Sequence, residues 1–401
     1  MSDPAQKAFR NPGRKLGVYV QVPFCQAKCS YCNFSTGVFS PHIHGPYVDA
    51  LCREIRGHAG LYRDAGLAGW NPAPRYEIDT LYVGGGTPSL LDPAYLAKIV
   101  EAVRETFPGA IEEATLEADP ETVTEDRARA WRKAGFNRIS LGAQSFHDDE
   151  LKAVGRRHRR ADIFTAARLL AAARFDNVSF DLIAGLPHQT TASWQASVGE
   201  LLRLEPVHIS IYILEIDQGS RLGRESLAGG RRYGAGLLPD DDQMADFYEW
   251  ACARLSDAGY HHYEISNWAI PGFPSRHNLK YWRREPYLGF GAGAHSFDGH
   301  ERWANAHDPA AYIAAIQQGR LAPEGREAVD SRQALEEELF LGLRQLDGID
   351  LKAIEDRYGV QLAERVDPLA AEGLVEMTGG RLRLAPSRLA VSNEVFVRLL
   401  D

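Results

Sequence analysis

Residues 16–32 read LGVYVQVPFCQAKCSYC, and this stretch joins an apolar run to a tight group of cysteines. The run over residues 16–22 is rich in valine and predicts a buried strand. Cys25, Cys29 and Cys32 follow within eight residues of one another. Because parallel β/α folds place their functional sites beyond the carboxyl ends of the strands, this loop is a candidate site.

The clustering of these cysteines indicates a metal site, since a disulfide framework would spread its cysteines along the chain. Three thiolates on one loop can ligate three irons of a [4Fe–4S] cluster and leave the fourth iron open to a small molecule. The alternatives are a zinc site completed by His42 or His44, or three buried free cysteines. Cys52 and Cys252 stand alone inside helical patterns, where we expect buried free thiols.

Further along the chain, apolar runs alternate with helical patterns in a regular rhythm. Six β/α units in succession predict an α/β fold whose parallel sheet has right-handed crossovers, either open or rolled into a partial barrel. The expected strands are residues 16–22, 78–83, 114–118, 138–143, 177–183 and 208–213. The expected helices are residues 47–59, 93–107, a segment capped by Thr124, 148–154, 161–173, 192–204 and, after a glycine-rich loop, 240–258.

Polar residues and glycines occur where these strands end. The sequence GGGTP over residues 84–88 closes the second strand, and its glycines would let a ligand approach the backbone closely. Glu117, Gln144, Asp181 and Glu215 lie in or just beyond the next four strands. Each alone could be a satisfied structural group, because a buried polar side chain needs a partner. Five such places around one rim predict a ligand site.

The last part of the chain has a different character. Helical patterns over residues 339–345, 351–358 and 362–371 precede a strand–turn–strand at 374–377 and 381–384, and a final helix covers 393–400. This order resembles a winged-helix module. Residues 331–401 carry nine Lys and Arg against thirteen Asp and Glu, so the basic footprint of a nucleic-acid-binding module is missing. We expect a packing or partner module that binds no nucleic acid.

The composition is that of an ordinary globular protein, with 44% hydrophobic and 25% charged residues over 401 positions. The net charge of −9 gives no general attraction to nucleic acid or anionic lipid. No run approaches the ~18 apolar residues of a membrane span. We expect a cytoplasmic monomer or dimer with at most peripheral membrane association. The expected parts are a tail (1–15), a core (16–245), an extension (246–330) and the C-terminal domain (331–401).

Several motifs together resemble a known family, the radical S-adenosylmethionine (SAM) enzymes, and cover nearly the whole chain. The resemblance is to the branch that contains oxygen-independent coproporphyrinogen III oxidase and the HemW-type haem chaperones. The motifs are VYVQVPFC (18–25), the cysteine loop, GGGTP (84–88), NRISLGAQSF (137–146), DLIAGLP (181–187), HNLKYW (277–282) and GAGAHS (291–296).

The resemblance implies a partial (βα)6 barrel, with the three cysteines holding the cluster and SAM on its open iron. It places Tyr19 and Tyr31 beside the cofactor, and Gly85, Gly86 and Thr87 along its methionine part. It further implies that SAM or its neighbouring groups contact a set of polar side chains on the rim, namely Glu117, Gln144, Arg156, Asp181 and, after the sixth strand, Glu215. Arg156 opens the run RRHRR over residues 156–160, whose other members we expect at the surface.

Three features point to the chaperone branch of this family. The oxidase has a further cysteine two places after the third, where this chain has Phe34, and it has a longer segment than the 24 residues that precede the loop here. The HNxxYW pattern is that of the chaperones. The resemblance therefore implies a protein that binds haem as cargo and passes it to acceptors, which we expect to be respiratory haem proteins.

In the chaperones the histidine of this motif, here His277, is implicated in haem binding. Neutral imidazole suits iron, and Tyr281 and Trp282 offer faces for a flat macrocycle. His277 could instead cap a loop beside core aromatics, and the rival ligands are His261, His262 and His295. The alternative function is decarboxylation of coproporphyrinogen III to protoporphyrinogen IX by a 5′-deoxyadenosyl radical. Whether SAM is cleaved or only bound stays open.

Overall fold

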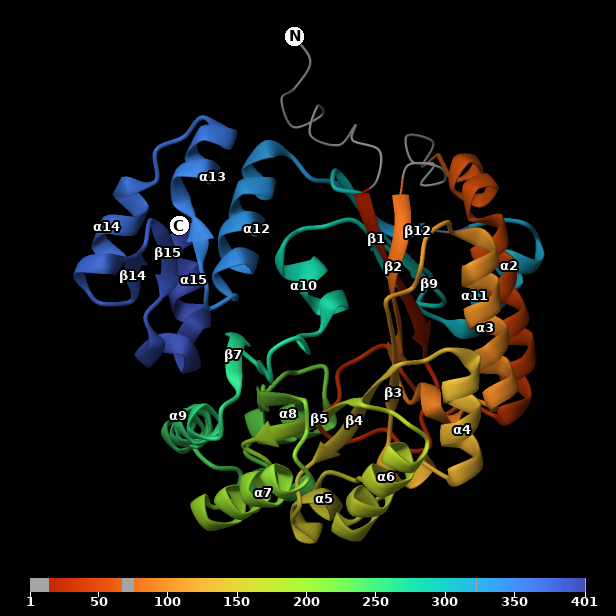
Figure 1. The fold of residues 1–401 in the computed structure, drawn as a ribbon, viewed down its shortest axis with the longest axis horizontal. Coiled ribbons are helices and arrows are strands. Elements are labelled where there is room, and N and C mark those ends of the chain that lie inside the picture. The colour runs from red at the N-terminus through yellow and green to blue at the C-terminus, as the bar shows by residue number, and fades with distance from the viewer. Residues whose placement is uncertain (1–13, 67–75, 322, 401) are drawn as a thin grey trace.

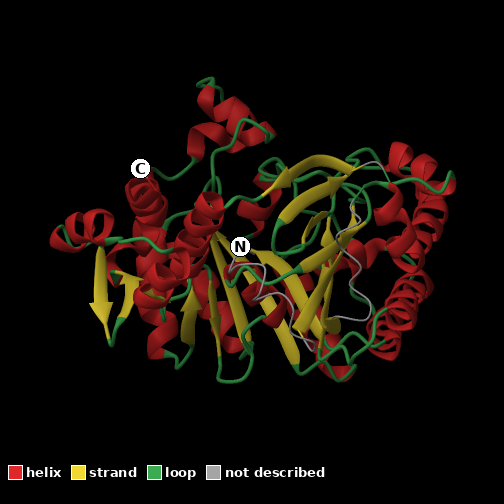
Figure 2. Ribbon diagram, turned by 90° about the horizontal axis from the view of Figure 1, so that it is seen from above, coloured by secondary structure: helices red, strands yellow, loops and turns green. Residues whose placement is uncertain are grey.

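The computed structural model describes residues 14–66, 76–321 and 323–400, and a curved sheet of twelve strands forms its centre. Six of these strands pair in parallel and in chain order, which confirms the predicted partial barrel. Figures 1 and 2 show their helices on the outer side of the curve. The strands are β1 (Arg14–Val22), β2 (Tyr76–Gly85), β3 (Glu113–Ala118), β4 (Arg138–Gln144), β5 (Asn177–Ala184) and β6 (His208–Ile213).

The helices that cover the barrel also lie close to their predicted places. The predicted N-cap of α4 is confirmed, because the hydroxyl of Thr124 accepts a hydrogen bond from the backbone N–H of Arg127 at 3.2 Å. The short helix α8 (Arg221–Leu227) lies where we expected only a glycine-rich loop. The others are α2 (His44–Asp64), α3 (Pro93–Thr106), α4 (Glu125–Ala134), α5 (Asp148–Ala153), α6 (Arg160–Ala172), α7 (Thr191–Arg203) and α9 (Asp241–Asp257).

Elements that the sequence analysis did not predict extend the sheet at both edges. At one edge β8 (Asn267–Ala269) pairs antiparallel with β6, and β7 (His261–Glu264) follows it. At the other edge β9 (Tyr287–Phe290) lies parallel to β1, and three antiparallel strands continue outward. These additions cover the exposed edges of the six-stranded unit. The remaining elements are α10 (Arg276–Trp282), β10 (His295–Phe297), β11 (Glu301–Asn305), α11 (Pro309–Gln317) and β12 (Pro323–Ala328).

The C-terminal part consists of helices and a small antiparallel sheet, as predicted, and lies to one side of the barrel (Figure 1). Its third strand, β13, was not predicted because it has only two residues. Glu337 of this part forms ion pairs with two arginines of the barrel side. Arg284 lies just after α10, and Arg302 lies on β11. The elements are α12 (Ser331–Leu343), β13 (Ile349–Asp350), α13 (Leu351–Tyr358), α14 (Ala363–Ala371), β14 (Val375–Thr378), β15 (Arg381–Leu384) and α15 (Ser392–Leu400).

Short 3-10 turns complete the described chain. They are η1 (Pro41–Ile43), η2 (Pro88–Leu90), η3 (Pro120–Thr122), η4 (Arg232–Leu237) and η5 (Pro386–Val391). Strand β1 begins at Arg14, two residues before the expected strand, and the rest of the expected tail lies outside the described residues. Of the helices that the structure describes, none is long and apolar enough to cross a membrane.

Candidate cofactor site

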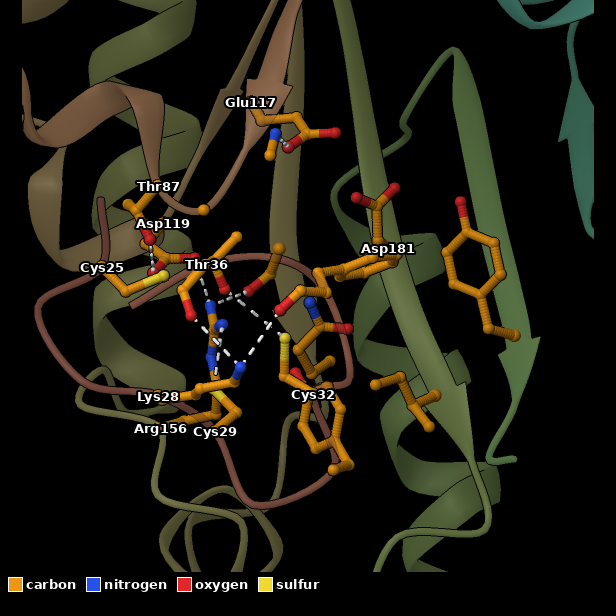
Figure 3. A pocket seen from close by; sticks show the side chains of 18 of the residues that line it. Cys25, Lys28, Cys29, Cys32, Thr36, Thr87, Glu117, Asp119, Arg156 and Asp181 are labelled. Carbon is orange, nitrogen blue, oxygen red and sulfur yellow. Dashed lines mark hydrogen bonds and ion pairs between the residues drawn. The ribbon is translucent and has the colours of Figure 1, made fainter. Parts of the chain in front are cut away.

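A cavity of about 450 Å³ opens beyond the carboxyl ends of β2–β6, between these strands and the loop that follows β1 (Figure 3). It brings together most of the residues predicted from motifs far apart in sequence. The cavity is lined, among others, by Cys25, Cys29, Tyr31, Cys32, Gly85, Gly86, Thr87, Glu117, Gln144, Arg156, Asp181 and Glu215. Of the predicted site residues, Tyr19 and His277 are not in this lining.

Backbone hydrogen bonds close the cysteine loop at its base. The N–H of Cys25 donates to the carbonyl of Gly37 at 2.8 Å, and the N–H of Gly37 donates to Pro23 at 2.9 Å. Inside the loop, the ammonium of Lys28 donates to the carbonyls of Phe34 and Thr36, each at 3.1 Å. These hydrogen bonds close the loop into one unit, and all three of its cysteines line the cavity.

Two neighbouring segments fix this closed loop to the barrel. The N–H of Ser30 donates to the carbonyl of Val154 after α5 at 3.0 Å, and the carbonyl of Ser30 accepts from Leu222 of α8 at 2.8 Å. The unpredicted helix α8 therefore helps to hold the cysteine loop. On the other side, Thr87 donates its N–H to the carbonyl of Phe24 at 2.7 Å.

The donor set of the cavity fits an iron–sulfur cluster better than a single zinc ion. Cys25, Cys29 and Cys32 all line the cavity, and a cluster binds each thiolate through a different iron. The two histidines of the zinc alternative lie elsewhere: His42 contacts Ser40, and the ring of His44 stacks on Phe24 with centroids 4.3 Å apart. Burial raises the pKa of Cys25, so its side chain carries a proton when no metal is bound. Because iron binds the thiolate, cluster binding would release this proton.

Gly85 and Gly86 bring backbone to the edge of the cavity. A Cβ on Gly86 would lie 2.6 Å from the carbonyl oxygen of Phe24 and 2.9 Å from the sulfur of Cys25, so no side chain fits there. Gly85 has a φ of 116°, and its N–H donates to a carboxylate oxygen of Glu117 at 3.0 Å. The other oxygen of Glu117 accepts from Tyr82 at 2.8 Å, and burial raises the pKa of this carboxyl to about 7.

Arg156 reaches the cavity from the segment between α5 and α6. Its guanidinium forms an ion pair with Asp119 and donates to the carbonyl of Gly142 at 2.9 Å. It also lies 3.8 Å from the sulfur of Cys29. Our expectation that the rest of this basic run is at the surface is wrong for His158, which is fully buried with its Nε2 3.0 Å from the carbonyl of Ala143. A loop that folds back under the strand ends explains this burial.

The strands beyond β3 add polar side chains with local partners. Asp181 on β5 accepts hydrogen bonds from Ser140 at 3.0 Å and Ser179 at 3.3 Å, and burial raises its pKa. Gln144 has a φ of 63° at the end of β4, where the pairing with β5 shifts register. Glu215 lies in the exposed segment after β6.

Several lining residues were not assigned a role from the sequence. Asp119 follows β3 directly, and its position at the strand end was a signal that it could line the site. Lys28 and Thr36 carried no signal, because their contribution depends on how the loop closes. The further unassigned lining residues include Asn33, Phe34, Tyr82, Ser140 and Tyr212.

A second cavity of about 680 Å³ adjoins the first and shares Asn33, Phe34, Gly85 and Glu117 with it. Tyr19, expected beside the cofactor, lines this second cavity, where its hydroxyl donates to Gln21 at 2.5 Å. The other lining residues are Gln21, Ser35, Tyr281, Tyr287, Gly293, His295 and His307.

His277 lies behind this second cavity, with 1% of its surface exposed. Its Nδ1 is 2.9 Å from the hydroxyl of Thr80 and its Nε2 is 2.9 Å from the hydroxyl of Tyr281. Burial lowers its pKa to about 3, so the ring is neutral at physiological pH. Both ring nitrogens are therefore engaged, and iron ligation by His277 would require one of these bonds to break.

Comparison with known proteins agrees with this fold and this site. Residues 19–201 match the radical SAM superfamily, and residues 329–387 match the HemN C-terminal domain. The solved structure of coproporphyrinogen III oxidase (HemN) from Escherichia coli superposes with a TM-score of 0.82 at 23% identity, covering 98% of this chain and 92% of that one. This likeness shows a shared fold. The fold and the cysteine site thus define a radical SAM protein, a class that carries a [4Fe–4S] cluster and SAM.

Relatives at higher identity narrow this class. Heme chaperone HemW from Bacillus subtilis (strain 168) is 32% identical, covering 94% of this chain and 97% of that protein. Heme chaperone HemW from Mycobacterium tuberculosis (strain H37Rv) is 35% identical, covering 97% and 96%. The chain belongs to the HemW family of haem chaperones.

Proposed function

We propose that this protein binds haem as cargo and transfers it to acceptor haem proteins, with SAM and a [4Fe–4S] cluster in the first cavity. The observation that carries this proposal is the similarity to proteins named heme chaperone over nearly the full length of both chains. It is supported by the second cavity, whose aromatic rings and histidines suit a flat iron-containing ligand.

The residues of the first cavity divide into two groups by what they can bind. Cys25, Cys29 and Cys32 would hold the cluster, which supplies one-electron chemistry when bound. The rim would hold SAM. The rim residues in this proposal are Tyr31, Gly85, Gly86, Thr87, Glu117, Gln144, Arg156, Asp181 and Glu215. Tyr19 would join them from the adjoining second cavity.

The contacts of the rim suggest how each part would act on SAM. The N–H of Gly85 is held by Glu117, so the glycine edge is fixed before a ligand arrives. Arg156 is held by Asp119 and the carbonyl of Gly142, and its remaining N–H donors can face a carboxylate. Asp181 can accept from ribose hydroxyls because its carboxylate lines the cavity, where Ser140 and Ser179 hold it in place.

The oxidase is the second candidate, and one residue weighs against it. Phe34 stands where the oxidase has a cysteine, and 67% of its surface is exposed beside both cavities. A phenyl ring offers an apolar face to a ligand and cannot ligate iron or donate a hydrogen atom as a thiol does.

The finer parts of this function are also proposals. We infer that the acceptors are membrane-associated respiratory haem proteins, that the protein acts in the cytoplasm as a monomer or dimer, and that it binds no nucleic acid. The excess of acidic residues in 331–401 supports the last point. We keep four parts: the tail (1–15), the radical SAM core (16–245), the extension with HNxxYW (246–330) and the winged-helix-like domain (331–401). We also infer that haem binding depends on His277.

One anaerobic experiment separates the two candidate functions. The reconstituted protein is offered haem in one arm and coproporphyrinogen III with SAM and a reductant in the other. We expect a stable Soret band in the first arm, and transfer of that haem to an apo-cytochrome. We expect no protoporphyrinogen IX in the second arm. Multiple turnovers to protoporphyrinogen IX with stoichiometric 5′-deoxyadenosine would contradict the chaperone function.

A further inference from the structure

Two histidines line the second cavity, and His295 is the one whose two ring nitrogens both make no hydrogen bond to the described residues. His295 lies on β10, its side chain is exposed to the cavity, and within the described part of the chain its ring nitrogens make no hydrogen bond that competes with a ligand. His277 differs, because both of its nitrogens are bonded and its ring is buried. The availability of a nitrogen lone pair therefore favours His295.

The two other rival histidines do not face this cavity. The ring of His262 stacks on Trp268 with centroids 4.0 Å apart, and its Nε2 is 3.1 Å from the carbonyl of Ile265. His261 is exposed on β7, at the opposite edge of the sheet from β10. His307 also lines the cavity, and its Nδ1 is 3.2 Å from the hydroxyl of Ser35, while its Nε2 lies 3.9 Å from Glu324, beyond hydrogen-bond distance. One nitrogen of His307 is therefore engaged, whereas neither nitrogen of His295 is engaged by a residue that the structure describes.

We propose that haem binds in the second cavity with the imidazole of His295 as an axial ligand, and that His277 acts through Tyr281 as a positioning residue. This inference rests on the proposed function and assigns the site at which the cargo is held. The volume of about 680 Å³ lies within the range of cofactor pockets.

The cavity also offers flat surfaces on which a porphyrin can pack. Tyr19, Tyr281 and Tyr287 contribute rings to its wall, and Tyr281 packs edge-on against Tyr287 with centroids 4.7 Å apart. Phe34 adds an exposed ring at the border with the first cavity. Aromatic faces contribute both buried area and favourable ring geometry to a bound macrocycle.

The charge state of His295 suits this role. Burial, His307 and Arg302 lower its pKa, so the ring is neutral near pH 7. Neutral imidazole is the form that ligates iron. The basis of the assignment remains the position of the ring and its free nitrogens.

His277 reaches the cavity only through its neighbour. Its Nε2 is bonded to the hydroxyl of Tyr281, which is one helical turn away on α10. Removing the imidazole would leave Tyr281 without this partner and would loosen a wall of the cavity. We therefore expect loss of His277 to weaken haem binding while the axial ligand stays in place.

The test compares ligation with affinity in the full-length reconstituted protein. Ferric haem is titrated into wild type, His295→Ala, His277→Ala and the control His300→Ala, which removes an exposed histidine between β10 and β11 outside the cavity lining. Electron paramagnetic resonance and the Soret band report the axial ligand. Cluster iron and SAM binding report the integrity of the rest of the molecule.

We expect His295→Ala to lose the imidazole signature and to regain it when free imidazole is added. His277→Ala should keep the signature and lose about tenfold in haem affinity, a typical effect of a residue that orients a binding group. His300→Ala should match wild type. If His295→Ala keeps the wild-type signature, or if His277→Ala alone loses it, the ligand assignment is wrong although the protein still binds haem. If wild type binds no haem, the proposed function fails as well.

Discussion

The two adjoining cavities differ in how their side chains are held. In the first, the polar groups are tied to one another: Glu117 to Gly85 and Tyr82, and Arg156 to Asp119. In the second, the wall includes the rings of Tyr19, Phe34, Tyr281 and Tyr287, and the imidazole of His295 makes no hydrogen bond within the described chain. A network of this kind fixes a polar ligand in one orientation, whereas rings and a free donor accept a flat ligand that must later leave. The contrast suits a resident cofactor beside a transferable cargo.

The largest effect should come from removing a thiol of the first cavity. Each of Cys25→Ala, Cys29→Ala and Cys32→Ala should lose cluster iron almost completely, because a cluster on three protein ligands has none to spare. Iron and sulfide content after anaerobic reconstitution measures this. Cys52→Ala is the matched control, since Cys52 is buried on α2 away from the cavity. Equal loss of iron from a folded Cys52→Ala protein would contradict the assignment.

The second largest effect should come from a branched side chain at Gly85 of the glycine edge, which should weaken SAM binding and leave the cluster in place. Gly85→Val places a branched side chain where we propose that SAM meets the backbone, at a residue with a φ of 116°, so we expect SAM affinity to fall by about 100-fold or more. Calorimetry measures SAM affinity, and cluster iron should remain. The control is Gly199→Ala on α7, where an added Cβ meets no atom within 4 Å. Normal SAM affinity in Gly85→Val would remove this edge from the site.

The pH dependence of stability should reveal the buried carboxyl between the cavities. Burial raises the pKa of Glu117 from 4.5 to about 7, so the folded protein binds a proton that the unfolded chain releases. Its contribution to the free energy of unfolding is therefore full below about pH 4.5 and is lost as pH rises to about 7. We expect Glu117→Gln to reduce this pH-dependent loss by about 2–3 kcal/mol, measured by denaturant unfolding of the apoprotein. An unchanged slope would show that Glu117 is already ionised when buried.

The smallest effect should come from the wall of the second cavity. Tyr281→Phe keeps the ring and removes the hydroxyl that partners His277, which should cost about 1–2 kcal/mol of stability. Haem affinity should fall only a few fold and SAM affinity should not change. A loss of SAM binding as large as that of haem would mean that the two cavities act as one.

The sequence predicted the regions that local interactions define and missed those that depend on contacts between residues far apart in the chain. The six parallel strands and their helices have strong local patterns, and Thr124 caps α4 through a residue three positions away. The strands of the extension were missed because they are short: β8 and β10 have three residues each, and β8 is fixed by pairing with β6, which is distant in sequence. Short apolar runs carry too little periodicity to be recognised alone.

The same reasoning applies to the sites. The cysteines and glycines of the first cavity occur in compact motifs, so their grouping could be predicted, although their binding roles stay predictions. Lys28 could not be assigned because its partners, the carbonyls of the loop, become neighbours only in the folded chain. For Asp119 the position at a strand end was a signal, but its ion pair with Arg156 could not be predicted. The motif around His277 suggested a haem ligand, but the engagement of both its nitrogens depends on Thr80, about two hundred residues earlier.

The closed base of the cysteine loop has a consequence for how the protein is made. Its two ends, Pro23 and Gly37, are joined by hydrogen bonds across a short stretch of chain, so little conformational entropy opposes their closure. This loop leaves the ribosome long before residues 281–307, which complete the second cavity. The cysteine loop can therefore fold during synthesis, before the residues that complete the second cavity have been added.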